Sequence, residues 1–237
     1  MVTATVSVRR RVGDVVDERA WAEASTDLLQ SAVPWRTFRW YKGQQHYSGT
    51  YWSATTRDHV IYESRLELAR LLFADFDPSV RHIVAQPFLM KATVEGKVRK
   101  HIPDYLLVTE QGPVVVDVKP LHHLSKADVS FTFDWVRQAV EFRGWGFEVW
   151  SEPPSVELEN IRFLSGYRRD WLFSAELLDE LSRAELDGVS LGQATRCLPG
   201  RPEPEVRAGV CHLLWKRRFA VDLERSLSPS SVLRWVG

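Results

Sequence analysis

The sequence has little cysteine, no long hydrophobic run and no excess of charge of either sign. Its two cysteines, Cys197 and Cys211, are too few for a disulfide framework and favour a reducing compartment. No apolar stretch approaches the roughly 20 residues that a membrane-spanning helix needs. The first residues, 1–11, are polar and basic and lack the apolar centre of a secretory signal. We therefore expect a cytoplasmic protein with no membrane partner.

The charge balance limits the modes of nucleic-acid binding open to the chain. Lys and Arg number 31, and Asp and Glu also number 31, so the formal net charge is zero. Because non-specific duplex affinity comes from neutralised phosphates, this balance excludes a strongly basic DNA coat protein. It leaves room for an enzyme with local basic patches. Hydrophobic residues make up 44% and charged residues 26%, which is typical of a folded globular chain and not of a disordered or fibrous one.

Strand-like and helical patterns alternate over the first two-thirds of the chain. Turn residues such as Glu95-Gly96 separate the strand-like segments. Around Asp117 the sequence is otherwise all valine, from Val114 to Val118, which is typical of a strand buried on both faces. The patterns predict helices over 18–32, 57–75 and 125–143, an early hairpin over 35–52, and strands over 80–92, 97–108, 114–118 and 147–150. This order indicates an α/β fold built on a mixed sheet flanked by helices.

The last third of the chain differs in kind. Its pattern predicts helices over 174–186, 190–197 and 203–216, then short strands over 219–223 and 231–234, which is the layout of a small winged-helix domain. Residues 170–237 contain nine Lys or Arg and ten Asp or Glu. A winged helix that binds duplex tightly is usually basic, so we expect this segment to dock a protein. The predicted domains are an N-terminal extension over 1–34, a catalytic domain over 35–170 and a winged-helix-like docking domain over 171–237.

Three charged residues on neighbouring predicted strands carry the strongest chemical signal. Asp104 follows a proline on one strand, and Asp117 and Lys119 lie two residues apart on the next, so the latter two point to the same face. Charges inside a valine-rich strand are costly unless they are paired or bind a metal. Two carboxylates that converge from adjacent strands suit a hard cation such as Mg²⁺. A nearby lysine can stabilise the charge that develops during phosphodiester hydrolysis. The arrangement resembles the PD-(D/E)xK motif of restriction-endonuclease-like nucleases.

A predicted helix before these strands offers a third carboxylate. Glu63 and Glu67 lie one turn apart, and at about 100° per residue Glu67 falls at the edge of the apolar stripe. An acid at that edge can face a site built on the sheet below. Glu63 falls further toward solvent. We therefore expect Glu67 to complete the site and Glu63 to face water or to assist.

These residues belong to a longer series of short motifs that resembles one known family. The series covers roughly residues 35–150 in order and comprises Ser64-Arg65-Leu66-Glu67-Leu68-Ala69, Asp77-Pro78-Ser79-Val80, Ile83, Gln86-Pro87-Phe88, Pro103-Asp104-Tyr105 and Val116-Asp117-Val118-Lys119-Pro120. It is similar to the TnsA-like endonuclease subunit of heteromeric transposases. The predicted winged-helix segment also suits the two-domain layout of that family.

The resemblance implies a Mg²⁺-dependent nuclease, with Mn²⁺ able to substitute, that cuts double-stranded DNA at transposon ends. It implies two protein partners, a DDE-type transposase subunit and an AAA+ ATPase regulator that recruits the C-terminal domain. Carried over by position, the catalytic residues are Glu67, Asp104, Asp117 and Lys119, and the metal site comprises Asp104, Asp117, Val118 and Glu67. The best-known member of the family has Gln where this chain has Asp117, which leaves the number of metal ions open.

Basic residues near the motif are candidates for contact with the DNA backbone. Lys97, Arg99, Lys100 and His101 directly precede Asp104, and they form either a solvated strand end or a phosphate-binding patch. Lys126, at the start of the following helix, is a further candidate. Two other functions stay open from the sequence. One is a stand-alone restriction- or resolvase-type nuclease, and the other is a non-catalytic DNA-docking adaptor, which the intact set of acids and lysine disfavours.

Overall fold

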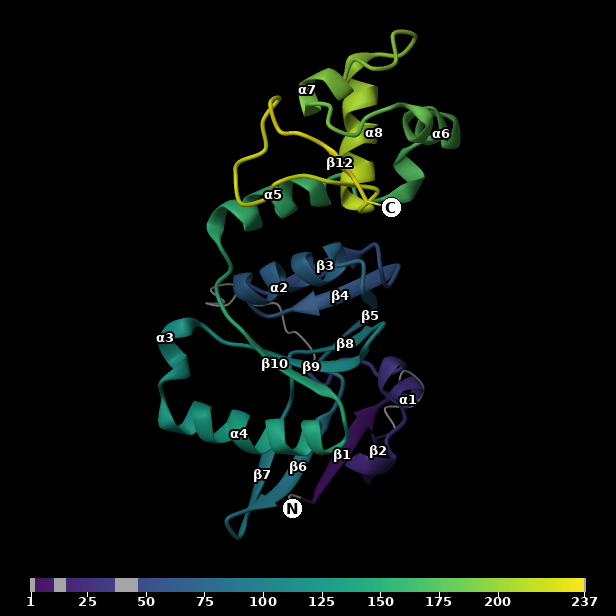
Figure 1. The fold of residues 1–237 in the computed structure, drawn as a ribbon. Coiled ribbons are helices and arrows are strands. Elements are labelled where there is room, and N and C mark those ends of the chain that lie inside the picture. The colour runs from purple at the N-terminus through teal and green to yellow at the C-terminus, as the bar shows by residue number, and fades with distance from the viewer. Residues whose placement is uncertain (1–2, 11–15, 37–46, 237) are drawn as a thin grey trace. The chain divides into compact units, whose positions relative to one another are not determined.

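The computed structural model describes residues 3–10, 16–36 and 47–236 and shows a mixed α/β protein with several small sheets (Figure 1). The chain divides into two compact units. Unit 1 comprises residues 1–75 and 79–152, and unit 2 comprises residues 76–78 and 153–237. No helix in the described ranges is long and apolar enough to cross a membrane.

One four-stranded antiparallel sheet of unit 1 has the strand order β2-β1-β6-β7. Its strands are β1 (Ala4–Arg9), β2 (Val16–Ala20), β6 (Leu89–Val94) and β7 (Lys97–His101). Glu95 and Gly96 join β6 to β7 with φ angles of 50° and 73°. Positive φ at both central residues matches the twist of the flanking strands and makes a tight hairpin. Because β1 pairs with β6, the N-terminal stretch forms part of the sheet of unit 1.

The second sheet of unit 1 carries the predicted acidic motif. Its order is β10-β9-β8-β5, with β5 (Val80–Ala85), β8 (Tyr105–Thr109), β9 (Gly112–Val118) and β10 (Gly146–Trp150). Strands β9 and β10 are parallel, so a crossover must connect them, and α3 (Leu121–Leu124) and α4 (Ala127–Phe142) supply it (Figure 1). Val115 and Val116, at the centre of β9, are fully buried, whereas Val114 and Val118 are partly exposed, so the predicted burial holds for the centre of the strand.

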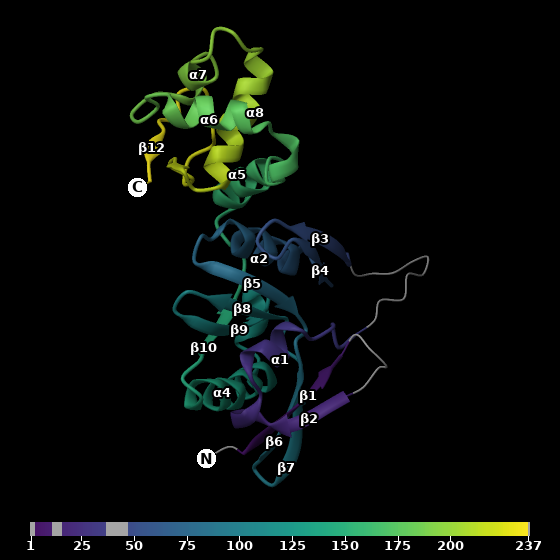
Figure 2. The ribbon, with the colours of Figure 1, turned by 90° about the vertical axis from the view of Figure 1, so that its right-hand side faces the viewer.

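The two sheets and α4 share one hydrophobic core. Val6 and Met90 from the first sheet, Leu106 and Val115 from the second, and Val136 from α4 are all fully buried in the same cluster. Figure 1 and Figure 2 both draw α4 next to β6 in the lower part of unit 1. This shared core fixes the bend of the chain between β7 and β8, where Asp104 lies.

Two predicted long strands are wrong as single strands, because a proline divides each. The predicted strand over 80–92 is β5 followed by β6, with Pro87 between them. The predicted strand over 97–108 is β7 followed by β8, with Pro103 between them. Proline has no N–H group for the ladder. At each break the chain passes from one sheet to the other.

Two predicted helices are also partly wrong. The segment over 57–75 begins with β4 (Asp58–Tyr62), which pairs with β3 (Gly49–Ser53), and only then continues as α2 (Arg65–Phe76). The segment over 18–32 holds the end of β2, a 3-10 turn over Trp21–Glu23 and the short helix α1 (Thr26–Gln30). Residues 37–46 of the early hairpin predicted over 35–52 lie outside the described residues.

Unit 2 contains the three predicted helices as α6, α7 and α8, preceded by α5, while the predicted strands over 219–223 and 231–234 are reduced to two residues each. The elements are α5 (Ser155–Ser165), α6 (Ala175–Arg183), α7 (Leu191–Ala194), α8 (Glu203–Trp215), β11 (Phe219–Ala220) and β12 (Arg234–Trp235). Helix α8 forms the centre of unit 2, and every residue from 209 to 215 is buried. Gly209 permits close packing, since a Cβ there would lie 2.6 Å from Leu181 of α6. Helix α5 precedes the predicted boundary at 170 and yet belongs to this unit.

Candidate functional site

A cleft of about 580 Å³ in unit 1 gathers all four residues predicted to be catalytic. It is lined, among others, by Arg36, Glu67, His101, Asp104, Asp117 and Lys119. The carboxylates come from α2, from the turn that leads into β8, and from β9. Residues far apart in the sequence thus meet at one edge of the second sheet.

The pairing of β8 with β9 brings the two aspartates together. Tyr105 pairs with Val116 in antiparallel register, so Asp104, directly before Tyr105, lies beside Asp117. The main-chain N–H of Val118 donates a hydrogen bond of 2.7 Å to Oδ2 of Asp104. Asp117 is only 3% exposed. The main chain of Val118, next to Asp117, is therefore hydrogen-bonded directly to the carboxylate of Asp104.

Lys119 comes directly after β9 and lines the same cleft as Asp117, as the two-residue spacing predicts. The N–H of Lys119 donates to the carbonyl of Trp150 at 2.8 Å, which extends the parallel pairing with β10 by one residue. The Lys119 side chain lines the cleft and is half-buried. Its position relative to the two aspartates is thus set by the regular sheet and not by a loop.

The cleft concentrates negative charge. Burial, and then the negative charges of Asp117 and Glu67, raise the pKa of Asp104 well above its usual value. The Val118 hydrogen bond and the Arg36 guanidinium act in the opposite direction without cancelling the rise. A bound cation would relieve this repulsion, because it favours the charged form of each carboxylate.

Glu67 lines the cleft and also secures the beginning of α2. Ser64, just before the helix, accepts a hydrogen bond from the N–H of Glu67 at 3.1 Å and donates its hydroxyl to Oε1 at 2.9 Å. Oε2 accepts the N–H of Glu63 at 2.7 Å. Burial, the largest effect, raises the pKa of Glu67. The structure therefore gives this carboxylate a helix-capping role in addition to its place in the cleft.

Glu63 does not lie on the helix, since α2 starts at Arg65, so the expected one-turn relation between the two glutamates is wrong. Its carboxylate nevertheless lines the cleft, where Arg36 donates to it at 2.8 Å and Gln86 Nε2 at 3.0 Å. The Glu63 side chain is 28% exposed within the cleft, a position that fits the alternative that it assists the site. The error in the one-turn relation follows from β4, which was assigned to the helix.

Gln86 is a buried residue of the site that the sequence reasoning did not identify. Its N–H donates to the carbonyl of Asp104 at 2.9 Å, and its side-chain oxygen accepts the N–H of Arg36 at 2.8 Å. Its φ of 47° is unfavourable for a residue with a side chain, and such strain clusters at functional sites. The motif Gln86-Pro87-Phe88 was the available signal. Gln86 ties both Glu63 and the main chain of Asp104 to the end of β5.

Of the four predicted phosphate-binding residues, the structure places one in the cleft. Lys100 lines it, at the end of β7. Lys97 is exposed on the same strand, and the Arg99 guanidinium lies 5.0 Å from the centre of the Phe131 ring. Lys126 is exposed at the N-terminus of α4. The other three basic residues lie on β7 and at the start of α4 and do not line the cleft.

The donor set fits a cation held by two carboxylates. Within the described ranges, no group of three or more His, Cys, Asp or Glu side chains is arranged to hold a metal ion. Mg²⁺ usually keeps several waters and takes only one or two protein carboxylates together with substrate phosphates. Asp104 and Asp117 supply such a pair, while both oxygens of Glu67 are engaged in hydrogen bonds. The predicted role of Glu67 as a direct metal ligand therefore has less support than a role as a negative charge beside the metal site.

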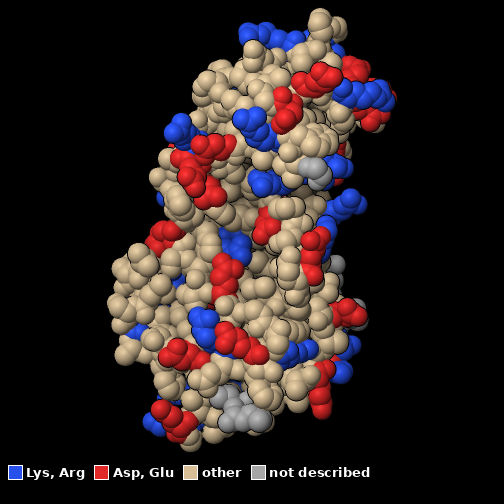
Figure 3. Space-filling view, viewed as in Figure 1, with Lys and Arg blue, Asp and Glu red and all other residues tan. Residues whose placement is uncertain are grey.

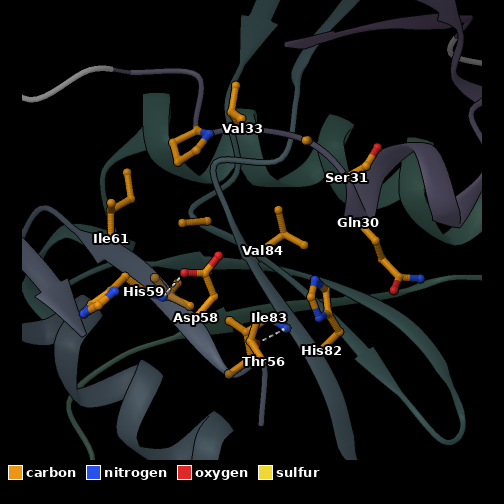
Figure 4. Close-up of a pocket in the computed structure, with 14 residues that line it drawn as sticks. Gln30, Ser31, Val33, Thr56, Asp58, His59, Ile61, His82, Ile83 and Val84 are labelled. Carbon is orange, nitrogen blue, oxygen red and sulfur yellow. Dashed lines mark hydrogen bonds between the residues drawn. The ribbon is translucent and has the colours of Figure 1, made fainter. Parts of the chain in front are cut away.

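A second cavity in unit 1, of about 440 Å³, lacks comparable chemistry (Figure 4). It lies between β4, β5 and residues 30–34. His59 and His82 lie on opposite sides of it, and Asp58 Oδ1 already accepts the N–H of His59 at 2.7 Å. The hydroxyl of Thr56, in the turn between β3 and β4, accepts the N–H of Ile83 of β5 at 3.1 Å. Since this second cavity has no paired carboxylates, the cleft at β9 is the better candidate for catalysis.

No protein-family model matches this sequence, and no curated protein shows significant sequence similarity to it.

Proposed function

We propose that the protein is a divalent-metal-dependent DNA endonuclease of the TnsA-like kind, acting as one subunit of a heteromeric transposase. The observation that carries the proposal is the convergence of Glu67, Asp104, Asp117 and Lys119 in one cleft. They reach it from a helix and two adjacent strands. A chance match to D…DxK would not require the helix acid and both strands to meet.

The fold around the cleft supports a restriction-endonuclease-like core. Strands β5, β8 and β9 are antiparallel neighbours, and β10 joins parallel to β9 after the helical crossover. Helix α2 brings its first turn to the cleft edge of this sheet. A mixed sheet with its acids on two central strands is the arrangement that the TnsA-like resemblance implies.

The cleft residues divide the work of phosphodiester hydrolysis. Asp104 and Asp117 are the residues that would hold a Mg²⁺ or Mn²⁺ ion, whose chemistry when bound is charge stabilisation and an acidified water. Asp104 is held in place by the Val118 N–H, so its carboxylate is pre-oriented. Lys119, fixed by the sheet, places a positive charge where the reacting phosphate gains negative charge. Glu67 adds a negative charge that disfavours an empty cleft and favours a cation.

The surface charges support dependence on partners. On the face that Figure 3 shows, basic and acidic side chains are interspersed on each unit without a broad basic field. With a net charge of zero, counterion release supplies little affinity for free duplex. We therefore propose that a DDE-type transposase subunit brings this protein to double-stranded DNA at transposon ends.

Unit 2 fits docking to a protein better than reading of DNA. Its order of helices and short strands suits a winged helix, in which α8 would enter the major groove. However, the first turn of α8 carries Glu203 and Glu205, and residues 209–215 are buried. This helix thus offers little exposed basic surface for phosphate or bases. We propose that unit 2 binds the AAA+ ATPase regulator of the transposition complex.

Metal titration of the full chain tests the proposed site. We expect Mg²⁺ and Mn²⁺ to bind the wild type, and Asp104→Asn and Asp117→Asn to lose most of that affinity while remaining folded. The control is Asp179→Asn, which changes an exposed carboxylate of α6 in unit 2. Calorimetry that gave the same affinity in all four proteins would contradict the assignment. A stand-alone nuclease is the second candidate, and sequence-specific cleavage of naked DNA by this protein alone would favour it.

A further inference from the structure

The carboxylate of Asp117 is bonded to a histidine from the other sheet. Nε2 of His101 lies 2.9 Å from Oδ1 and 2.9 Å from Oδ2. Because the oxygens of a carboxylate accept hydrogen bonds, we assign the hydrogen of this contact to Nε2, which then donates to both oxygens. No other hydrogen-bond donor within the described ranges reaches this carboxylate. His101 is thus the one described partner of a nearly buried acid.

The imidazole is itself held in a defined orientation. His101 is the last residue of β7, where it pairs with Met90 of β6. Its ring meets the buried ring of Trp135 edge-on, with centroids 6.3 Å apart and planes at 87°. The His101 side chain is 15% exposed, on the wall of the cleft. Strand β7 and helix α4 therefore fix the donor before any ligand arrives.

His101 and Asp104 are three residues apart and flank Pro103, which is buried at the bend between the two sheets. Both side chains face the end of β9, one bonded to Asp117 and the other to the N–H of Val118. The bend thus determines where both aspartates stand relative to each other. A shift of β7 would move the donor and, with it, the Asp117 carboxylate.

We propose that His101 is a positioning residue that orients the Asp117 carboxylate toward the cation; this inference rests on the proposed function. A donor shared by two oxygens can stay on one of them while the other binds a cation. Hydrogen-bond partners of ligating carboxylates typically change metal affinity by about 10–100-fold when removed. The histidine is not required as a ligand in this role. Its contribution is to hold a buried charge in one rotamer.

Two variants separate the hydrogen bond from the packing of the ring. His101→Phe keeps a ring against Trp135 but has no donor, whereas His101→Gln keeps an N–H donor. We expect the affinity for Mn²⁺, measured by calorimetry on the full chain without DNA, to fall about 10–100-fold in His101→Phe and by clearly less in His101→Gln. His82→Phe is the matched control, because it changes a partly buried histidine of the second cavity in the same unit. It should leave the affinity for Mn²⁺ unchanged.

The outcomes distinguish this inference from the proposed function. Unchanged or tighter Mn²⁺ binding in His101→Phe would overturn the inference, and so would a loss in His101→Gln as large as in His101→Phe. If those results came with lost binding in Asp104→Asn, the proposed metal site would still stand. Absence of Mn²⁺ and Mg²⁺ binding in the wild type would overturn both. Thermal unfolding of each variant shows whether a loss of affinity reflects a loss of fold.

Discussion

Asp104→Asn should make unit 1 more stable in the absence of metal and should remove its stabilisation by metal. Burial and the charges of Asp117 and Glu67 raise the pKa of Asp104, so the folded state binds its proton more tightly than the unfolded state does. Such an acid costs stability as the pH rises above its ordinary pKa of 3.8. Asparagine removes that cost, and its side-chain oxygen can still accept the N–H of Val118, which now bonds at 2.7 Å.

We expect a gain of the size usual for a single stabilising substitution. Such substitutions commonly give about 0.5–2 kcal/mol. About 1 kcal/mol corresponds to a rise in Tm of roughly 2–4 °C for a domain of this size. Mg²⁺ at 100 times its Kd would add about 2.7 kcal/mol to the free energy of unfolding of the wild type and nothing to that of Asp104→Asn. In excess Mg²⁺ the wild type should therefore be the more stable of the two proteins.

The assay is thermal unfolding of wild type and Asp104→Asn in EDTA and in excess Mg²⁺, at pH 7 and near pH 4. In EDTA the gap in Tm should be widest at pH 7 and should narrow toward pH 4, where the unfolded carboxyl also takes up its proton. A variant that is less stable than the wild type in EDTA at pH 7 would refute the electrostatic reasoning. An equal rise in Tm with Mg²⁺ in both proteins would refute the role of Asp104 in binding the cation.

Three further predictions concern other parts of the chain. Asp75→Asn should lower the free energy of unfolding of unit 1 by about 2–4 kcal/mol in a denaturant titration, because the buried carboxylate accepts four hydrogen bonds from residues 51–55 and an amide oxygen keeps only half of them. A denaturation midpoint equal to that of the wild type would contradict this. Burial lowers the pKa of His212, so the unfolded state takes up the proton first as the pH falls, and unit 2 should lose stability below about pH 6.5. His212→Gln should make the free energy of unfolding less dependent on pH in this range. Curves of stability against pH that run parallel in the two proteins would count against the prediction. Lys100→Ala should lower the slope of log affinity against log salt concentration by about 1 for any DNA duplex. An unchanged slope would mean that the DNA phosphates do not contact Lys100.

The acidic motif could be predicted from sequence because local rules determine it. The valine run and the flanking turn define β9, and alternation along a strand places Asp117 and Lys119 on one face. Asp104 needed only the next strand to pair with β9, which the short turn between them favours. Helix α4 was likewise predictable from its apolar stripe, and α8 from the proline- and glycine-containing loop that precedes it.

The errors arose where distant partners decide the structure. Val60 and Ile61 fit the spacing of the helix that follows, yet β4 forms because β3 pairs with it. The prolines at 87 and 103 gave a local signal for a break, but no local signal shows that each break leads into a different sheet. His101 looked like one more basic residue at a strand end. Its contact with Asp117 exists only because the two sheets meet at that bend.

Metal-dependent hydrolysis of DNA in this cleft is tested most directly by nicking of a supercoiled plasmid with the full chain, in Mn²⁺ at low salt. We predict slow nicking that EDTA abolishes, that Asp117→Asn and Lys119→Met lose, and that Asp179→Asn retains. Addition of a DDE-type transposase partner and its end sequence should direct the same activity to the transposon ends. Nicking that persists in EDTA or in both cleft variants would contradict a catalytic role for these residues, and so would the absence of nicking under every one of these conditions.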